Sequence, residues 1–288
     1  MVLYLNGEIV DEREALIPVW DRGVLFGDGL FETVRAYDGK PFRMSRHLER
    51  LRRGCAELRI TGIPADGEIE AAVSDLYRTN VGEGDAYIRI TLTGGTYDGG
   101  KTLARPADPN VFIVVQPYGG YPERFYRQGM CLTVSSLRRN PDSPLSRVKS
   151  NNYLDTLVAK QEASDCGADD AVVLNSDGYL AEGTSSNLFL VMGESLATPA
   201  ADCGLLPGIT REVVMELCDN LRLPCVTGYF TLEDLLDCDE AFLTVSTGEI
   251  VPVASVDRET IGEICPGAVT LRLHRAYGDL VKVELGLP

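Results

Sequence analysis

The sequence has few histidines, and its cysteines lack the spacing of a metal centre or a disulfide framework. It contains only two histidines, His47 and His274, so a histidine-rich metal site is not expected. The eight cysteines are scattered, without a C-x-x-C pair or zinc-like spacing, and are expected to be buried or idle thiols. No apolar run exceeds the length of a strand, so no membrane span is expected. The first residues lack the features of a signal peptide, and a cytoplasmic location is therefore expected.

Positive charge is also scarce. Lys and Arg number 27 against 43 Asp and Glu, giving a net charge of −16. This balance argues against nucleic acid and anionic membrane surfaces as partners, although it leaves room for a local basic pocket that binds a phosphate. The length of 288 residues favours two domains. We expect a small α/β domain at 1–117, a Pro- and Gly-rich linker at 118–127, and a larger domain at 128–288.

Hydrophobic periodicity and turn residues predict mixed α/β structure in both halves rather than a regular βαβ series. The first half is expected to hold hairpins at 2–10 and 30–43, helices at 45–58 (capped by Ser45) and 68–80, strands at 86–93 and 110–116, and a mobile glycine-rich loop at 94–100. The second half is expected to hold strands at 130–135, 170–174, 179–181, 187–192 and 240–245, and helices at 152–165, at 208–221 and from about 268.

Taken singly, the candidate chemical residues have ordinary explanations. Lys149 is one of only five lysines and precedes a predicted helix, but a lysine there is usually a surface group. Glu182 and Thr247 would be turn residues and Arg50 a surface charge on a helix. Residues 208–210 open a predicted helix whose N–H groups and positive dipole end suit a phosphate, although an ordinary helix start after Pro207 is the better explanation when the segment is taken alone.

Together, several segments resemble the fold-type IV pyridoxal-phosphate enzymes. They follow in the same order and at similar separations, and they cover nearly the whole chain. The segments are DRGVLFGDGLFET at 21–33, RMSRHLERL at 43–51, KSNNY at 149–153, EGTSSNLF at 182–189, LPGITR at 206–211 and VSTGEIVP at 245–252. This family includes branched-chain aminotransferases, D-amino-acid aminotransferases, (R)-amine transaminases and aminodeoxychorismate lyases.

The resemblance implies a two-domain α/β fold with a pseudo-barrel in the larger domain, pyridoxal 5'-phosphate as cofactor, and a homodimer. Lys149 would bind the cofactor aldehyde and then move the proton. Glu182 would pair with the protonated pyridine nitrogen, and Tyr153 would hydrogen-bond the phenolic oxygen. The other cofactor-binding residues that it implies are Arg50, Ser186, Ile209, Thr210 and Thr247.

The resemblance also implies a set of substrate-facing residues: Phe31, Thr33, Arg35, Tyr87 and Arg89. The Tyr87-Ile-Arg89 sequence is similar to a strand of branched-chain aminotransferases, although a strand that alternates an aromatic and a solvated arginine is an alternative explanation. Residues 94–101 lack the arginine and histidine with which D-amino-acid aminotransferases clamp the substrate carboxylate. In contrast, residues 26–33 and the spacing within 149–153 are closer to the D-amino-acid and lyase subgroups.

The expected reaction is transamination between an amino acid and a 2-oxo acid such as 2-oxoglutarate, with a branched-chain or broad range of L-amino acids favoured. Three alternatives remain: a D-amino-acid aminotransferase, a 4-amino-4-deoxychorismate lyase, and a non-catalytic relative that binds pyridoxal phosphate or another metabolite.

Overall fold

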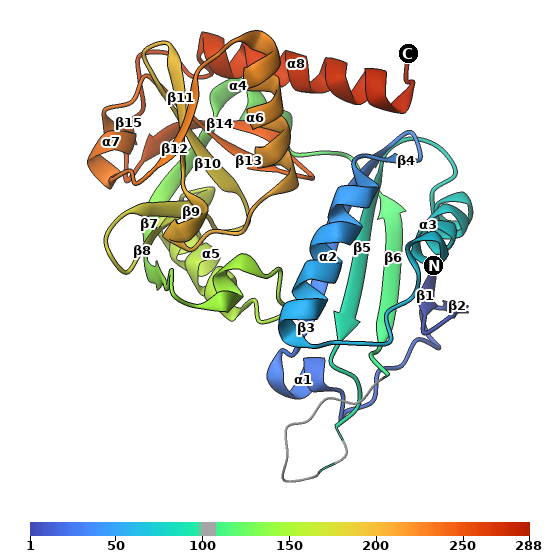
Figure 1. Ribbon diagram of the computed structural model, residues 1–288. Helices are drawn as coiled ribbons and strands as arrows, with labels where there is room; N and C mark the ends of the chain where they lie inside the picture. Colours follow the sequence, from blue (N-terminus) through green and yellow to red (C-terminus); the bar gives the residue numbers. More distant parts are fainter. Residues whose placement is uncertain (98, 100–107) are drawn as a thin grey trace. The chain divides into compact units, whose positions relative to one another are not determined.

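The computed structural model describes residues 1–97, 99 and 108–288, which divide into two compact units (Figure 1). Unit 1 comprises Met1–Gly119 and Val148–Tyr153, and unit 2 comprises Gly120–Arg147 and Leu154–Pro288. The segment that carries Lys149 therefore groups by its contacts with the N-terminal half. The domain boundaries expected from the sequence stay a prediction. The two units are defined by contacts within the folded chain, and such contacts do not show which segments fold independently.

Unit 1 is built on a six-stranded antiparallel sheet in the order β2-β1-β6-β5-β3-β4. Both expected hairpins form, and their two-residue turns, Asn6-Gly7 and Asp38-Gly39, have positive φ at every position, as tight hairpin turns require. The strands are β1 (Val2–Leu5), β2 (Glu8–Asp11), β3 (Gly29–Tyr37), β4 (Lys40–Pro41), β5 (Ala86–Thr93) and β6 (Val111–Pro117).

Two long helices of unit 1, α2 (Met44–Leu58) and α3 (Asp66–Asn80), pack on this sheet, and the short α1 (Arg22–Phe26) precedes β3 (Figure 1). The apolar face expected for α2 enters the core through Leu48, Leu51 and Cys55. Ser45 is not its cap, because the chain enters α2 through Arg43 in the left-handed conformation (φ 53°), with no side-chain cap. Within the expected glycine-rich loop at 94–100, Asp98 and Gly100 lie outside the described residues, as does Lys101.

Unit 2 holds a nine-stranded mixed sheet in the order β12-β11-β10-β13-β14-β7-β8-β9, with β15 paired to β14. Strand β9, at one end of this order, also packs against β10 and β11, so the sheet curls back on itself. The β7–β8, β14–β7 and β11–β12 pairs are parallel and the others antiparallel. The strands are β7 (Met130–Arg139), β8 (Asp170–Asn175), β9 (Leu180–Gly183), β10 (Asn187–Met192), β11 (Ser195–Pro199), β12 (Cys225–Gly228), β13 (Glu240–Val245), β14 (Glu249–Val256) and β15 (Glu259–Thr260).

The helices of unit 2 pack on this sheet: α5 lies against β7 and β8, while α6 and α8 lie against β13 and against each other. On the neighbouring strands β10 and β13, Phe189 and Phe242 are paired and fully buried, and their rings stack with centroids 5.0 Å apart. The helices are α4 (Glu123–Gln128), α5 (Leu154–Cys166), α6 (Ile209–Leu221), α7 (Leu232–Leu236) and α8 (Ala268–Leu285), with short 3-10 turns at Pro144–Arg147 and Ala201–Cys203.

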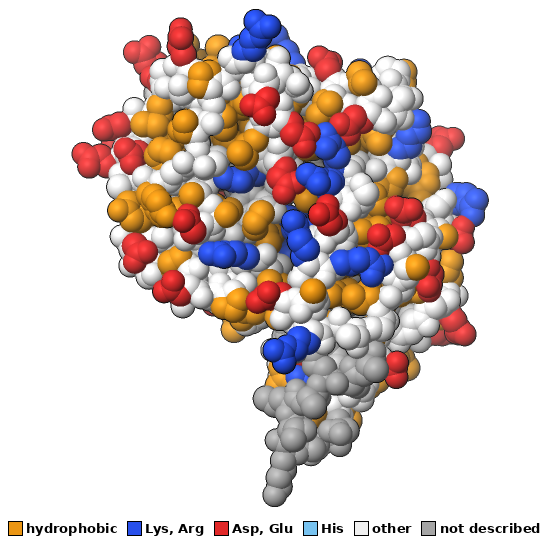
Figure 2. Space-filling model, in the orientation of Figure 1, with side chains coloured by type: hydrophobic (Ala, Val, Ile, Leu, Met, Phe, Trp, Pro, Cys, Tyr) orange, Lys and Arg blue, Asp and Glu red, His pale blue; other side chains and the backbone are white. Residues whose placement is uncertain are grey.

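The elements expected from the sequence are present in unit 2, with ends that shift by a few residues. Six regular elements of unit 2 were missed: α4, α7, β11, β12, β14 and β15. Helix α4 falls within the segment expected to be a linker. Among the helices that the structure describes, none is both long and apolar enough to cross a membrane. Acidic and basic side chains are interspersed over the face drawn in Figure 2 rather than gathered by sign.

Candidate active site

The five expected substrate-facing residues lie on one face of the sheet of unit 1. Successive side chains of a strand point to opposite faces, so Phe31, Thr33 and Arg35 of β3 share a face. Tyr87 of β5 pairs with Arg35, and Arg89 pairs with Thr33. The residues between them, such as Val34 and Ile88, point the other way into the core beneath α2 and α3. Strand periodicity and register thus bring together residues from two segments that lie far apart in the sequence.

The ring of Phe31 is the centre of this face. The Nζ atom of Lys149 lies 4.6 Å from the ring centroid, and the guanidinium carbon of Arg89 lies 3.9 Å from it. Tyr153 packs edge-on against the same ring at 5.5 Å. Phe31 is 4% exposed, so two cations and a phenol meet around a buried aromatic ring. The structure therefore brings together three expected substrate or cofactor residues and the expected catalytic lysine.

Lys149 is held by backbone pairing with the start of β3. The Phe31 N–H donates to the Lys149 carbonyl at 3.0 Å, the Asn151 N–H donates to the Gly29 carbonyl at 2.9 Å, and Ser150 forms a bridge with Leu30. A Cβ atom on Gly29 would lie 2.4 Å from the Asn151 side chain. Only glycine allows this approach, which fixes the position of the lysine backbone relative to the ring of Phe31.

Arg50 is buried in an ionic cluster that the sequence interpretation missed. Its Nε and Nη2 atoms donate to the two carboxylate oxygens of Glu32, each at 2.8 Å, and His47 Nδ1 lies 2.7 Å from the Glu32 Oε2 atom. Burial alone would raise the pKa of Glu32, but the charge and hydrogen bonds of Arg50, with those of His47, outweigh it and hold the pKa at about 2. Burial lowers the pKa of His47. A neutral His47 therefore donates from Nδ1, since an ionised carboxylate can only accept.

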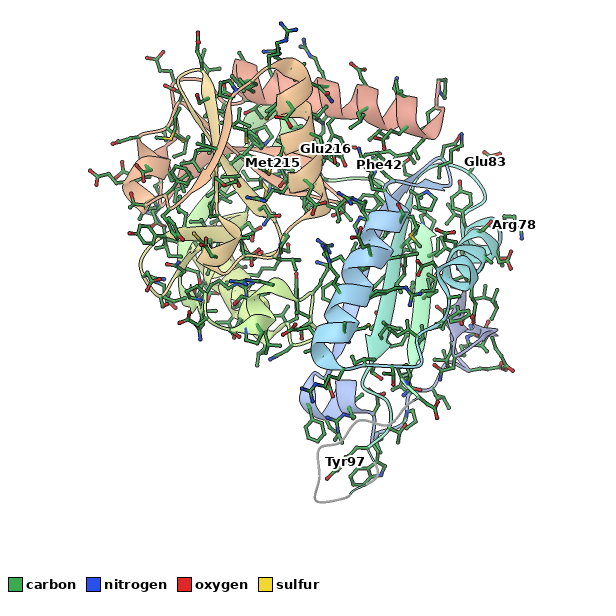
Figure 3. The ribbon with its side chains drawn as sticks, viewed as in Figure 1. Phe42, Arg78, Glu83, Tyr97, Met215 and Glu216 are labelled. Carbon is green, nitrogen blue, oxygen red and sulfur yellow. The ribbon has the colours of Figure 1, made fainter. Side chains whose placement is uncertain are left out.

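Arg35 also has an acidic partner. Its Nε and Nη2 atoms donate to the same oxygen of Asp85 at 3.1 and 2.7 Å, and its guanidinium lies 4.4 Å from the ring centroid of Tyr37. These contacts anchor Arg35 toward the end of β3. At the opposite end of the strand, Tyr97, labelled in Figure 3, packs edge-on against Phe26 at 5.7 Å.

In unit 2 the expected partner of the pyridine nitrogen, Glu182, lies in β9 with its side chain 7% exposed. The Arg139 Nη2 atom lies 2.9 Å from its Oε1 atom, and the Leu206 N–H donates to its Oε2 atom at 3.1 Å. The Asn187 side-chain amide donates to the Leu206 carbonyl at 2.9 Å, which joins the segments 182–189 and 206–211. Sequence interpretation did not single out Arg139, because nothing in the sequence shows which charge lies two strands away.

Next to these contacts, the hydroxyl oxygen of Ser186 is buried and has no hydrogen-bond partner among the residues that the structure describes. Helix α6 begins with Ile209 and Thr210 after Gly208, which provides no side-chain cap. The first N–H groups of a helix have no acceptor within it and lie at the positive end of its dipole. A Cβ atom on Gly208 would lie 2.0 Å from the Asn187 side chain, so glycine is required where the chain enters the helix. Met215 and Glu216, labelled in Figure 3, mark a half-buried side of α6 farther along.

The expected site residues divide between the two units. Thr247, between β13 and β14, is 9% exposed. Unit 1 carries Phe31, Thr33, Arg35, Arg50, Tyr87, Arg89, Lys149 and Tyr153, and unit 2 carries Glu182, Ser186, Ile209, Thr210 and Thr247.

Comparison with known proteins gives consistent matches. A family model described as amino-transferase class IV matches residues 29–256. A putative branched-chain-amino-acid aminotransferase of Methanocaldococcus jannaschii is 37% identical, covering 97% of this chain and 96% of its own. An aminodeoxychorismate lyase of Bacillus subtilis is 33% identical, covering 98% and 95%. The crystal structure of a T.th. branched-chain amino acid aminotransferase with pyridoxamine 5'-phosphate aligns with a TM-score of 0.90 at 31% identity, covering 97% and 93%. The expected fold-type IV α/β architecture is confirmed by this likeness.

Proposed function

Because this chain belongs to the class IV aminotransferase family, we propose that it uses pyridoxal 5'-phosphate to move an amino group between an amino acid and a 2-oxo acid such as 2-oxoglutarate. The observation that carries the proposal is the grouping of Lys149, Tyr153 and Arg89 around the ring of Phe31 in unit 1. An amine that binds an aldehyde and then moves a proton must be held at a fixed place, and backbone pairing with β3 holds this one.

The residues of unit 2 fit a phosphorylated aromatic cofactor. The buried Ser186 hydroxyl lacks a protein partner, so a ligand oxygen there would satisfy it. The N–H groups of Ile209 and Thr210, at the uncapped start of a 13-residue helix, suit a phosphate. By family resemblance, we also propose Thr247 and Arg50 as phosphate-binding residues.

When bound, pyridoxal phosphate supplies an electron sink for the negative charge that develops at the substrate α-carbon. The Lys149 amine would hold the cofactor through its aldehyde, with loss of water, and would later carry the proton taken from that carbon. The Tyr153 hydroxyl would donate a hydrogen bond to the phenolic oxygen of the ring. Glu182 would accept a hydrogen bond from the pyridine nitrogen and would keep that nitrogen protonated.

The sheet face of unit 1 supplies the substrate contacts. Arg89 brings positive charge for a substrate carboxylate, and Phe31 and Tyr87 bring apolar surface for a side chain. Thr33 and Arg35 complete the face, with Arg35 oriented by Asp85. A branched-chain or broad range of L-amino acids is the favoured donor class, supported by the likeness to the aminotransferase of M. jannaschii.

Hydride trapping tests the cofactor assignment. Protein incubated with pyridoxal phosphate should absorb in the near-visible, lose that band on treatment with borohydride, and then carry the cofactor mass on the peptide that contains Lys149. Lys149→Ala should show none of these. A wild-type protein without cofactor on that peptide would refute the proposal. A screen of L- and D-amino acids, read by bleaching of the band and its recovery with a 2-oxo acid, identifies the donor and its enantiomer.

The aminodeoxychorismate lyase reaction is the nearest alternative, favoured by the likeness to the B. subtilis enzyme. It would release pyruvate from aminodeoxychorismate with no added amino acceptor. Transamination instead requires a 2-oxo acid for each turnover, so pyruvate measured with and without an acceptor separates the two reactions.

A non-catalytic relative that only binds pyridoxal phosphate needs phosphate contacts but neither the lysine nor the ring carboxylate. The presence of both Lys149 and Glu182 argues against this alternative. Turnover by Lys149→Ala at the wild-type rate would remove the lysine from the mechanism.

We also infer that the enzyme is a homodimer. Large apolar side chains are exposed along the segment before β3: Leu16, Val19, Trp20, Val24 and Phe26. Such a patch on a polar surface is typical of protein interfaces. Light scattering after size exclusion should give twice the mass of 31.4 kDa, and a single-chain mass would refute the dimer. The cytoplasmic location stays a prediction.

A further inference from the structure

We propose that Arg139 is a positioning residue for this reaction, holding the Glu182 carboxylate in place and ionised toward the pyridine nitrogen. The proposal rests on the proposed function and extends it to a residue that contacts neither substrate nor cofactor. Its basis is the 2.9 Å ion pair between the two side chains and the way in which the sheet of unit 2 directs the arginine.

Arg139 reaches Glu182 across an intervening strand. Strand β8 lies between β7 and β9. Arg139, the last residue of β7, pairs with Asn175 of β8. Glu182 of β9 pairs with Val173, two residues earlier on the same strand β8. The long arginine side chain can cross β8 and place one donor on Oε1, while the Leu206 N–H occupies Oε2. Donors on both oxygens fix the rotation of the carboxylate, as a directed hydrogen bond to a ring nitrogen requires.

An irregularity in β7 sets the direction of Arg139. Between Val134 and Arg138, β7 advances four residues while its partner β8 advances two. This bulge is held from α5 by Glu162, which accepts from the Ser135 hydroxyl at 2.6 Å and the Ser136 N–H at 3.0 Å. A bulge changes the direction of the side chains that follow it. By holding the bulge, Glu162 therefore stabilises the direction in which the Arg139 side chain points.

One donor atom of the Arg139 guanidinium is in an unfavourable environment, which a purely stabilising role would not explain. Its Nε atom is buried and has no hydrogen-bond partner within 1–97, 99 and 108–288, which costs roughly 1–3 kcal/mol. A surface arginine without a specific role would rotate so that this donor binds water. Here the guanidinium is instead oriented toward Glu182, and that orientation leaves Nε buried.

The chemical consequence concerns the charge on Glu182. The positively charged guanidinium lies beside a carboxylate that is 7% exposed and stabilises its ionised form. Without that cation, the carboxyl group takes up a proton at higher pH. A neutral acid no longer balances a protonated pyridine nitrogen, and the cofactor becomes a poorer electron sink.

The test replaces the guanidinium and measures the holoenzyme. Arg139→Gln and Arg139→Met should lower kcat at pH 7 by about tenfold or more, with the KM for the amino donor changed less than about threefold. The acidic limb of the kcat profile should move up by about one to three pH units, and the pH titration of the near-visible cofactor band should move with it. Arg139→Lys should recover most of the wild-type kcat and most of the wild-type pH dependence. Arg124→Gln, which removes an exposed ion pair with Asp169, is the matched control and should behave as wild type.

A double-mutant cycle shows whether Arg139 acts through Glu182. In a Glu182→Gln background, Arg139→Gln should change neither kcat nor cofactor affinity further. An additive loss in that background, or neutral Arg139 variants with wild-type kcat and an unmoved band titration, would overturn the proposal. Either neutral variant suffices if the other does not fold. Failure of the wild-type protein to bind pyridoxal phosphate would instead refute the proposed function.

Discussion

Replacement of Glu32 by Gln should destabilise unit 1 and should also make the Arg50 side chain, which Glu32 binds, less ordered. The carboxylate is fully buried, and its pKa falls from 4.5 to about 2 in the folded protein. At 1.36 kcal/mol per pKa unit, this depression corresponds to roughly 3 kcal/mol of stability at pH 7. Glutamine keeps the shape and one acceptor but removes the charge, so a loss of about 3 kcal/mol is expected, a large part of a typical total stability.

The pH dependence gives the direction of the effect. A carboxyl group with a depressed pKa stabilises the fold fully above its unfolded value of 4.5, and that stabilisation disappears as the pH falls toward 2. The difference between wild type and Glu32→Gln should therefore be constant from about pH 6 upward and shrink steadily below about pH 4.5.

Urea unfolding of the apoprotein across this pH range measures the difference. The single tryptophan, Trp20, lies in unit 1, so its fluorescence reports on that unit, with circular dichroism as a second probe. The control is Asp85→Asn, which removes the charge of a carboxylate that pairs with Arg35 and is more exposed than Glu32. It should lower the free energy of unfolding by about 1 kcal/mol or less. If Glu32→Gln unfolded at the wild-type urea concentration at pH 7, the ionic account of this cluster would be wrong.

Three further predictions concern the cofactor site. Ser186→Ala should weaken pyridoxal phosphate binding by about 1 kcal/mol, measured by equilibrium titration, and leave the apoprotein as stable as wild type, because the hydroxyl has no protein partner to lose. Gly208→Ala should weaken both cofactor binding and folding, by about 1–3 kcal/mol in urea unfolding, since its Cβ would overlap the Asn187 side chain. Lys149→Ala should fold as wild type but lose turnover by several orders of magnitude in a half-reaction assay.

Local patterns were sufficient to predict much of the fold. Alternation along β5 and the apolar run of β10 predicted strands whose ends match the structure, and the two hairpin turns were predicted from Asn-Gly and Asp-Gly pairs between short predicted strands. Short elements such as β11 and β12 were missed because four or five residues carry little periodicity, and their strand form depends on pairing with each other and with β10.

Side-chain partners of the candidate site were harder to predict. Glu32 lies between Leu30 and Val34, which both point into the core, so strand alternation could have indicated a buried acid in need of a cation, but this signal was missed. Its two partners lie three residues apart on α2, as a helix face allows. The pairing of Arg139 with Glu182 could not be predicted, because it depends on the order β7-β8-β9 and on a bulge that no local pattern specifies.

The two charged groups assigned to opposite ends of the cofactor are each held by a protein group of opposite charge. Arg50 is bound by Glu32, and Glu182 is bound by Arg139. Neither charge is left alone in the apoprotein, where an unpaired buried ion would cost several kcal/mol. Each of these two side chains is therefore already ordered within its own unit before the cofactor binds, and binding should add stability to the folded protein. At a free cofactor concentration 100 times its Kd, the gain should be about 2.7 kcal/mol. In Glu32→Gln and Arg139→Gln the gain at that same cofactor concentration should be smaller, because each variant must first order a charged side chain that the wild-type protein already holds in place.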